Sequence, residues 1–382
     1  MSSCRLHFSL PLLLLTSTST SQPSFISVTG GLRGEFGIGS VGQGNLQIVA
    51  AAYSDGADIH RCKLYAHDAN GTVTSITEPA LAGRVFVQGF IPSSSGGGYL
   101  AGSVIPNGQD EHDLLVVRID GSSNVAWITT LDIPFDQQLM AIAELGTGGL
   151  VATGVDNASG SHDVLVLRLD GSGNLLWSVV EGGPLDEEGR GIAADALGTL
   201  ITGRQVNFGN ETDALLYRFD LSGTLEWQGG FGGIQDDIGH GVIRCANGTF
   251  VMAGTTASFG PADHLQRRKR NAWLIALESD GDTLWTAALG DTLMDREAFA
   301  VAEMSNGDLM LVGEHGLERS TDAWAMRTSN TGTLLWERDY DTGDQDRLVS
   351  IRPDTSGFWA AGRTFGADAQ QVLFLRRDDL GF

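Results

Sequence analysis

The chain has 382 residues, of which 47 are Asp or Glu and 24 are Lys or Arg, so its formal net charge is −23. This acid excess argues against nonspecific nucleic-acid binding, because phosphates must be neutralised by cationic side chains. Hydrophobic residues make up 42% of the chain, which excludes a disordered protein and allows a sizeable core. The 52 glycines are about twice the usual share.

The N-terminal residues predict a secretory signal peptide over residues 1–22. A basic start with Arg5 precedes an apolar stretch of eight residues and then a Ser/Thr run. The apolar stretch is too short to span a bilayer, and no later run reaches the required length. We therefore expect a secreted or periplasmic protein without a membrane span, in which residues 23–382 form a single domain.

A motif that ends in tryptophan recurs along the chain. The segment LRIDGSSNVAW ends at Trp127, and similar segments end 50, 100, 158 and 209 residues later. The five tryptophans are Trp127, Trp177, Trp227, Trp285 and Trp336. The same turn occurs without its tryptophan near Asp68 and Asp378, which brings the number of units to seven. Such a period is typical of a repeat architecture.

Each unit contains four short strand signals. In residues 190–228 these are RGIAAD, TLITG, DALLYRFD and TLEWQ, with glycine-bearing turns between them. Four antiparallel strands in a unit of about 50 residues predict an all-β fold, a β-propeller with seven four-stranded blades.

The two ends of the chain predict how the ring closes. The last unit stops after its third strand, while residues 25–31 read FISVTGG. Phe25 there takes the place of the tryptophan, followed by the glycine pair seen in other units. We expect this N-terminal strand to complete the last blade, which would hydrogen-bond both open edges and remove an aggregation-prone strand.

The recurring tryptophans allow a structural and a functional interpretation. Aromatic side chains on one exposed face would form a binding platform. One position repeated in successive outer strands is better explained as core between neighbouring blades, since large aromatics dominate burial. We therefore assign Trp127, Trp177, Trp227, Trp285 and Trp336 a structural role.

The repeat resembles that of bacterial secreted β-propeller repeat proteins. The pattern GG-x-x-D-D/E-x-x-x-G-I-A-x-D, followed by D-x-x-L-x-R-x-D-x-x-G-x-L-x-W, is matched best in residues 163–260. This resemblance implies the fold without naming an activity. The D-x-x-G-x-L-x-W turn is also similar to the tryptophan-docking turn of quinoprotein propellers, but its Asp-to-Gly spacing is one residue shorter. We assign no cofactor.

Positions that differ between repeats are the candidates for function. Thirteen residues after the successive tryptophans stand Met140, Arg190, His240, Ala298 and Val349. Arg190 and His240, with Asp236 and Asp237 nearby in sequence, are candidate ligand-binding residues at the channel mouth. The interblade loops around them are acidic, which fits either Ca²⁺ ligands or a solvated surface. We favour the solvated surface, because no loop has the alternating carboxylate pattern of a calcium site.

One unit contains an insertion with the only basic cluster of the chain. The loop TTASFGPADHLQRRKRN includes Arg267, Arg268, Lys269 and Arg270. It is a candidate docking site for an anionic partner, and equally a loop that neutralises its acidic neighbours.

Two hypotheses for function follow from these patterns. The first is a noncatalytic, monomeric binding or scaffold propeller, whose ligand is an unknown protein or polysaccharide and whose longer interblade loops form the interaction face. The second is a propeller enzyme, either a quinoprotein-like oxidoreductase or a polysaccharide-active enzyme, with its site near Arg190 and His240. The first is favoured because the sequence has no H-x-H, HExxH, G-x-S-x-G or CxxC motif.

Overall fold

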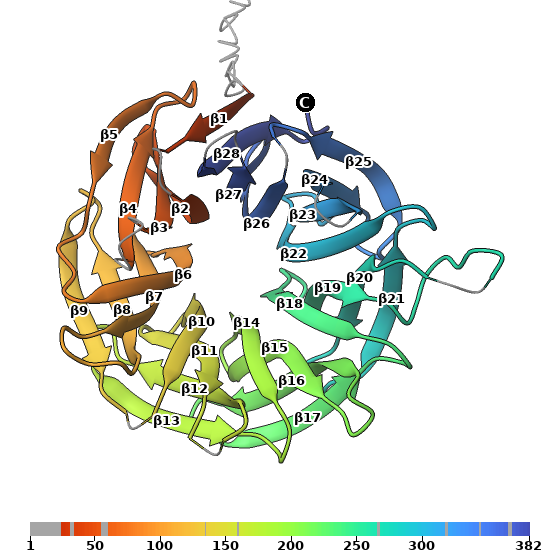
Figure 1. Cartoon of the computed structure of the whole chain (residues 1–382), viewed down its shortest axis with the longest axis horizontal. Coiled ribbons are helices and arrows are strands. Elements are labelled where there is room, and N and C mark those ends of the chain that lie inside the picture. The colour runs from red at the N-terminus through yellow and green to blue at the C-terminus, as the bar shows by residue number, and fades with distance from the viewer. Residues whose placement is uncertain are drawn as a thin grey trace, which may run out of the picture.

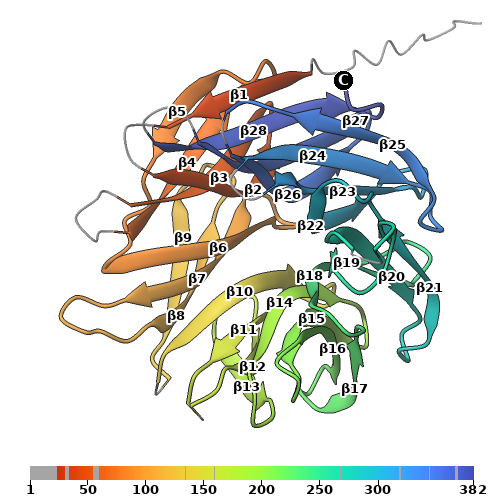
Figure 2. The same cartoon turned by 45° about the vertical axis from the view of Figure 1, so that its right-hand side comes forward.

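The computed structural model describes residues 24–30, 34–54, 60–133, 135–158, 160–265, 268–317, 320–343, 345–365 and 369–382. These residues form seven antiparallel sheets of four strands each. The sheets are arranged around a central axis as the blades of a propeller (Figures 1 and 2). The predicted all-β, seven-bladed fold is therefore confirmed. Over the described ranges, no helix has the length and apolar character needed to cross a membrane.

Each blade runs from an inner strand beside the axis to an outer strand at the rim (Figure 1). The inner strands are β2 (Glu35–Gln43), β6 (Arg84–Pro92), β10 (Gln137–Glu144), β14 (Glu187–Ala194), β18 (Asp237–Arg244), β22 (Asp295–Glu303) and β26 (Asp346–Asp354). The second strands are β3 (Leu46–Ser54), β7 (Gly98–Ile105), β11 (Leu150–Asp156), β15 (Gly198–Val206), β19 (Phe250–Thr256), β23 (Leu309–Leu317) and β27 (Gly357–Phe365). The third strands are β4 (His60–His67), β8 (Asp113–Ile119), β12 (Asp163–Leu169), β16 (Thr212–Asp220), β20 (Asn271–Leu277), β24 (Ser320–Thr328) and β28 (Gln370–Asp378). The outer strands are β5 (Val73–Thr77), β9 (Val125–Leu131), β13 (Leu175–Glu181), β17 (Leu225–Phe231), β21 (Thr283–Leu289), β25 (Leu334–Tyr340) and β1 (Phe25–Thr29).

The core of the molecule lies between the blades. Third strands such as β8, with the sequence DLLVVRI, are buried along nearly their whole length because neighbouring blades cover both faces. Outer strands such as β13 alternate between more and less exposed residues, as expected where one face meets solvent. The buried apolar residues group into seven clusters, one at each junction between blades. Each blade is therefore stabilised by the burial of apolar surface against two neighbours.

The N-terminal strand closes the ring. β1 pairs with β28 in the sheet that also contains β26 and β27, so the last blade takes its outer strand from the start of the chain. Phe25 lies opposite Arg376, in the register that places Trp177 opposite Arg168 in another blade. The prediction that residues 25–29 complete the last blade, with Phe25 in the tryptophan position, is thus confirmed.

The outer-strand aromatic residue of one blade packs on a turn of the next blade. This turn joins the third and fourth strands and contains a glycine with positive φ, such as Gly223 at 86°. A Cβ atom at Gly223 would lie 3.0 Å from the Trp177 ring. The contacting pairs are Trp127 with Gly173, Trp177 with Gly223, Trp227 with Gly281, Trp285 with Gly332, Trp336 with Gly381, and Phe25 with Gly71. Three of the indoles also donate a hydrogen bond to a carbonyl of that turn, as Trp177 does to Leu221 at 3.1 Å.

The one junction without an aromatic residue also lacks the glycine. In the first blade Ser75 occupies the tryptophan position, as its pairing with Ala66 shows. The facing turn of the second blade has Ser123 with a φ of 64° where other turns have glycine. The loss of both partners at one junction indicates that the glycine is needed to accommodate the aromatic ring, as well as for its backbone conformation.

Substitution at these turns should therefore lower the free energy of unfolding at Gly223 but not at the matched position Ser123. Gly223→Ser adds a Cβ atom against Trp177 and places it on a backbone with positive φ, which costs about 1–2 kcal/mol of the free energy of unfolding. Ser123→Gly should leave that free energy unchanged or raise it slightly. Urea unfolding of both variants measures this, and a Gly223→Ser variant as stable as the parent would contradict the packing role of the glycine.

Candidate functional site

The connections between strands define two faces of the ring. The loops between blades and the loops joining second to third strands lie on one face, which we call the loop face. Aspartates of the interblade loops accept hydrogen bonds from backbone N–H groups beside the third strands. These bonds join Asp136 to His112 (3.1 Å), Asp186 to His162 (2.9 Å), Asp236 to Thr212 (2.9 Å) and Asp295 to Arg270 (2.8 Å). Part of the acidity of this face thus serves to cap strands, which refines the expectation of a merely solvated surface.

Every inner strand contains a β-bulge near the loop face. The ladder between first and second strand skips one residue in each blade, for example Arg190 between Gly189 and Gly191. In six blades a glycine of the second strand lies opposite the bulge. A Cβ atom at Gly203 would collide with the carbonyl oxygen of Glu188, and the other five glycines have the same relation to their inner strands. Bulges release a residue from the ladder and redirect its side chain.

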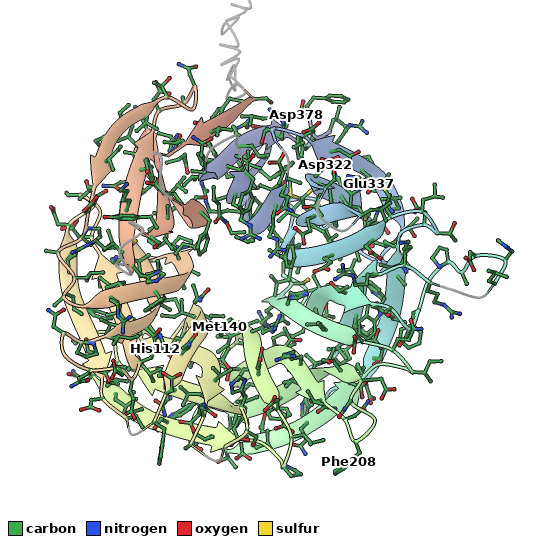
Figure 3. The ribbon with its side chains drawn as sticks, in the orientation of Figure 1. His112, Met140, Phe208, Asp322, Glu337 and Asp378 are labelled. Atoms are coloured by element: carbon green, nitrogen blue, oxygen red, sulfur yellow. The ribbon has the colours of Figure 1, made fainter. Side chains whose placement is uncertain are left out.

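The seven bulged residues are all different and form a ring at the mouth of the channel. They are Ile38, Gln88, Met140, Arg190, His240, Phe299 and Val349. Met140 lies beside the central opening in Figure 3. The counting rule from the tryptophans was wrong in one blade: it predicted Ala298, but an extra residue in the preceding loop makes Phe299 the equivalent position.

Arg190 is held by a carboxylate that it shares with a second arginine. Its Nε and Nη2 atoms donate to Glu188 Oε2 at 3.1 and 2.9 Å, and Arg204 donates to the other oxygen. Burial by itself would raise the pKa of Glu188, but these hydrogen bonds from Arg204 and Arg190 lower it to about 2. Two guanidinium groups share one carboxylate here, and Asp186 and Asp236 lie near enough to stabilise the charge of Arg204.

His240 lies among arginines rather than carboxylates. Its ring packs edge-on against Phe299 with the ring centres 5.0 Å apart. Its Nε2 atom is buried and has no hydrogen-bond partner within the described residues. Burial, together with the positive charges of Arg190, Arg347 and Arg270, lowers the pKa of His240 to about 3. The imidazole is therefore neutral at physiological pH.

Asp236 and Asp237 are engaged in the loop instead of facing His240. Asp236 caps Thr212, as described above, and Asp237 is fully buried. The Asp237 side chain accepts hydrogen bonds from the backbone N–H groups of Gly233 at 2.8 Å and Ser258 at 3.3 Å. Both carboxylates thus stabilise the loop next to the site.

The basic loop divides into parts with different surroundings. Arg267 lies outside the described residues. Arg268 is exposed and donates to the Gly260 carbonyl at 3.3 Å, and the Lys269 carbonyl accepts a hydrogen bond from Asn271. Arg270 instead forms an ion pair with Glu297 of β22 and affects the pKa of His240. Arg270 therefore belongs to the channel mouth, whereas Arg268 and Lys269 remain on the loop.

Two arginines of the last blade form a wall of the mouth that the sequence analysis missed. Arg347 on β26 and Arg363 on β27 are direct cross-strand partners. Arg347 donates to both oxygens of Glu314, at 2.8 and 2.6 Å, and its guanidinium lies 4.5 Å from the centre of the Phe299 ring. Burial and the charge of Arg347 lower the pKa of Arg363, and no carboxylate among the described residues forms an ion pair with it.

A small cavity opens beside these two arginines. Its volume is about 210 Å³, and Arg347 and Arg363 line it together with Phe36, Ile38, Gln88 and Val349. A second cavity of about 270 Å³ shares Phe36 and Gln88 with it and continues toward His60. Three of the bulged residues thus contribute to one hollow at the mouth, with cationic, amide and apolar groups side by side.

The sequence contained a signal for these arginines. In each blade with the repeated glycine of the second strand, the residue that follows this glycine pairs with the inner-strand residue two positions before the bulge. In the fourth blade, for example, Arg204 follows Gly203 and pairs with Glu188. These cross-strand pairs are Glu188 with Arg204 in the fourth blade, Glu297 with Glu314 in the sixth, and Arg347 with Arg363 in the seventh. Reading both positions together would have identified the Glu/Glu and Arg/Arg pairs.

Comparison with known proteins supports the fold alone. No protein-family model matches the chain, and no curated protein matches it. Among solved structures, puromycin hydrolase aligns with a TM-score of 0.56 at 12% identity, over 89% of this chain and 51% of that chain. Sqt1 from Chaetomium thermophilum aligns with a TM-score of 0.51 at 11% identity, over 87% and 84% of the two chains. The chain thus spans about half the length of puromycin hydrolase, and membership of a bacterial secreted repeat family stays a prediction.

The surroundings of His240 predict an unusual titration. The folded pKa of about 3 lies below the ordinary value of 6.5, so the unfolded chain binds a proton that the folded chain does not. The free energy of unfolding should therefore fall as the pH drops from about 6.5 toward 3. NMR titration of the imidazole should give a midpoint near 3.

Two variants test the cause of this shift. Arg190→Gln removes a positive charge and should raise the His240 midpoint. His240→Gln should flatten its part of the pH dependence of stability. A midpoint that stays near the ordinary histidine value in the parent protein would contradict the described environment.

Proposed function

We propose that this protein is a noncatalytic binding propeller that holds an anionic group of its ligand at the channel mouth on the loop face. The observation that carries the proposal is Arg363, a half-buried guanidinium beside Arg347 and against a cavity, without a carboxylate partner among the described residues. Like charges directly opposite each other in a sheet are unfavourable. A bound carboxylate would relieve this repulsion and form charge-assisted hydrogen bonds.

The cavity favours an acidic saccharide as the ligand. Guanidinium groups bind carboxylates in a planar, bidentate manner. The ring of Phe36 and the side chain of Ile38 offer apolar contacts to the face of a sugar ring, and Gln88 offers hydrogen bonds to its hydroxyl groups. A uronate unit of a polysaccharide combines these chemical features. A protein ligand with acidic side chains is the other partner class that the charge would attract.

The surroundings of His240 favour binding over catalysis at the second candidate site. A general acid or base works best with a pKa near the operating pH. The pKa of about 3 makes His240 a weak base, and at neutral pH the ring is not an imidazolium that could act as a general acid. Asp236 and Asp237 are engaged in loop hydrogen bonds and do not supply a partner carboxylate. We therefore place the enzyme hypothesis second.

Location and assembly follow as parts of the same proposal. A secreted or periplasmic location rests on residues 1–22, which lie outside the described residues. A monomer fits a ring in which the strand of the N-terminus covers the edge of the last sheet. The net charge of −23 supports a partner other than nucleic acid.

Binding of a short oligogalacturonate, measured by calorimetry, tests the proposal. The oligouronate should bind, and its neutral galactose counterpart should bind on the order of 10-fold more weakly. Arg363→Gln should weaken uronate binding on the order of 10- to 100-fold, because it removes a hydrogen bond between charged groups. Binding should also weaken as salt is raised.

The basic loop provides the matched control. The double variant Arg268→Ser with Lys269→Ser removes two cations of the basic loop and should leave uronate binding unchanged. If this variant abolishes binding while Arg363→Gln has no effect, the site lies on the basic loop and the mouth assignment is wrong. Preference for an acidic peptide over the uronate would overturn the saccharide assignment.

A further inference from the structure

A second polar cluster lies in the sixth blade, away from the channel mouth. It contains His315 on β23, Asp322 on β24, and Glu337 and Asp339 on β25. Figure 3 shows Asp322 and Glu337 in this blade, outward from the central opening. Direct pairing of His315 with Asp322, and of Trp324 with Asp339, places the four side chains on one face of the sheet.

His315 is buried without satisfying its ring nitrogens. Only 7% of the residue is exposed, and neither Nδ1 nor Nε2 has a hydrogen-bond partner within the described residues. The Nε2 atom lies 3.2 Å from Asp339 Oδ1 and 3.9 Å from Asp322 Oδ2, directed into the group of carboxylates. Asp339 is thus within ion-pair distance of Nε2 but is not aligned for a hydrogen bond. Because a buried polar atom without a well-aligned partner is costly, a cation held between this nitrogen and the carboxylates would satisfy both.

The ligand atoms are close enough to share a cation. One atom each from His315, Glu337 and Asp339 lies within 4.8 Å of the others. A tetrahedral zinc site, with metal–ligand distances of about 2.1 Å, separates its ligands by roughly 3.4 Å. The side chains of Glu337 and Asp339 are 24% and 53% exposed, so small rotations can bring their oxygens inward.

Arg296 orients the cluster without neutralising it. Its Nε atom lies 2.8 Å from Glu337 Oε1, and its Nη1 atom lies 2.9 Å from Asp291 Oδ2. This pairing leaves Glu337 its second oxygen and fixes the carboxylate beside His315, the cross-strand partner of Arg296. Residues that hold a ligating carboxylate in this way are typical of metal sites. Three carboxylates against one guanidinium leave negative charge that a divalent ion would balance.

We propose that the sixth blade binds a divalent transition-metal ion, best matched by Zn²⁺, through His315, Glu337 and Asp339. Asp322 is the adjacent third carboxylate and the fourth residue of the cluster. An imidazole with carboxylates is a ligand set for zinc and its first-row neighbours, whereas Ca²⁺ and Mg²⁺ prefer oxygen ligands alone. The ion would join strands β23 and β25 at the rim, and this proposal is independent of the one for the channel mouth.

Zinc titration of the full chain after chelator treatment tests the proposal. Calorimetry should show one bound Zn²⁺ per chain, and the melting temperature should rise with zinc in a concentration-dependent manner. X-ray absorption should show one imidazole and oxygen ligands at about 2.0–2.2 Å. Asp339→Asn and His315→Gln should each weaken zinc binding by at least about 10-fold.

The control variant is Asp341→Asn, which removes a neighbouring exposed carboxylate outside the ligand set. It should change zinc affinity by less than a factor of about 3, because the interaction of an exposed charge with its surroundings is weak. Asp339 is half exposed, so the fold of Asp339→Asn is expected to persist even if His315→Gln fails to fold. Unchanged zinc affinity in Asp339→Asn, or no binding by the parent chain, would overturn the proposal. If zinc bound at Cys62 or Cys245 instead, the Asp339→Asn variant would keep the zinc affinity of the parent chain.

Discussion

The close approach of the second strand to the bulged inner strand, which requires a glycine in six of the seven blades, is the constraint on which the channel mouth depends. A side chain at Gly203 would collide with the carbonyl of Glu188, and the same relation recurs in six blades. In these six blades the absence of a Cβ atom leaves room for the bulged inner strand, and the bulge frees one residue from the ladder. The first blade is bulged as well, with Ala51 at the glycine position. The repeat thereby separates two tasks. Glycine and the paired strands maintain the fold, while the freed residue can differ in every blade.

Charges around the mouth are balanced within the fourth blade, where Arg190 and Arg204 share Glu188, but between blades in the sixth and seventh. The Glu/Glu pair of the sixth blade and the Arg/Arg pair of the seventh would each be unfavourable in isolation. The bidentate contact between Arg347 and Glu314 joins the two pairs, and Arg270 approaches from the basic loop to balance Glu297. Arg363 is the one arginine of these pairs that forms no ion pair with a carboxylate of the described residues. The neutrality of His240 has the same origin, since the surrounding guanidinium groups oppose its protonation.

The fold could be predicted from the sequence because its determinants repeat. The tryptophan spacing, the D-x-x-G turn and the apolar third strands each recur with the blades, so several copies support each assignment. The placement of Phe25 could also be predicted from the sequence, because the last unit lacks an outer strand and residues 25–29 can supply it. The site was only partly predictable. Arg190 and His240 were found by counting along the chain, but a single extra residue displaced Phe299, and Arg347 and Arg363 appear together only across the ladder. The cluster at His315 was missed because its members come from three strands, and only Asp322 stands at a position where other blades also have an aspartate.

Closure by β1 has a consequence for the order in which the molecule is assembled. Ser24 and Phe382, which share a hydrogen bond, are 358 positions apart in the sequence. During synthesis the first strand leaves the ribosome long before its partner β28 exists, while the intervening blades can form from local hairpins. The ring therefore has to be completed in a late step with very long-range contacts, which are slow to form. Until then β28 lacks its outer neighbour, and its unpaired edge is open to pairing with another chain.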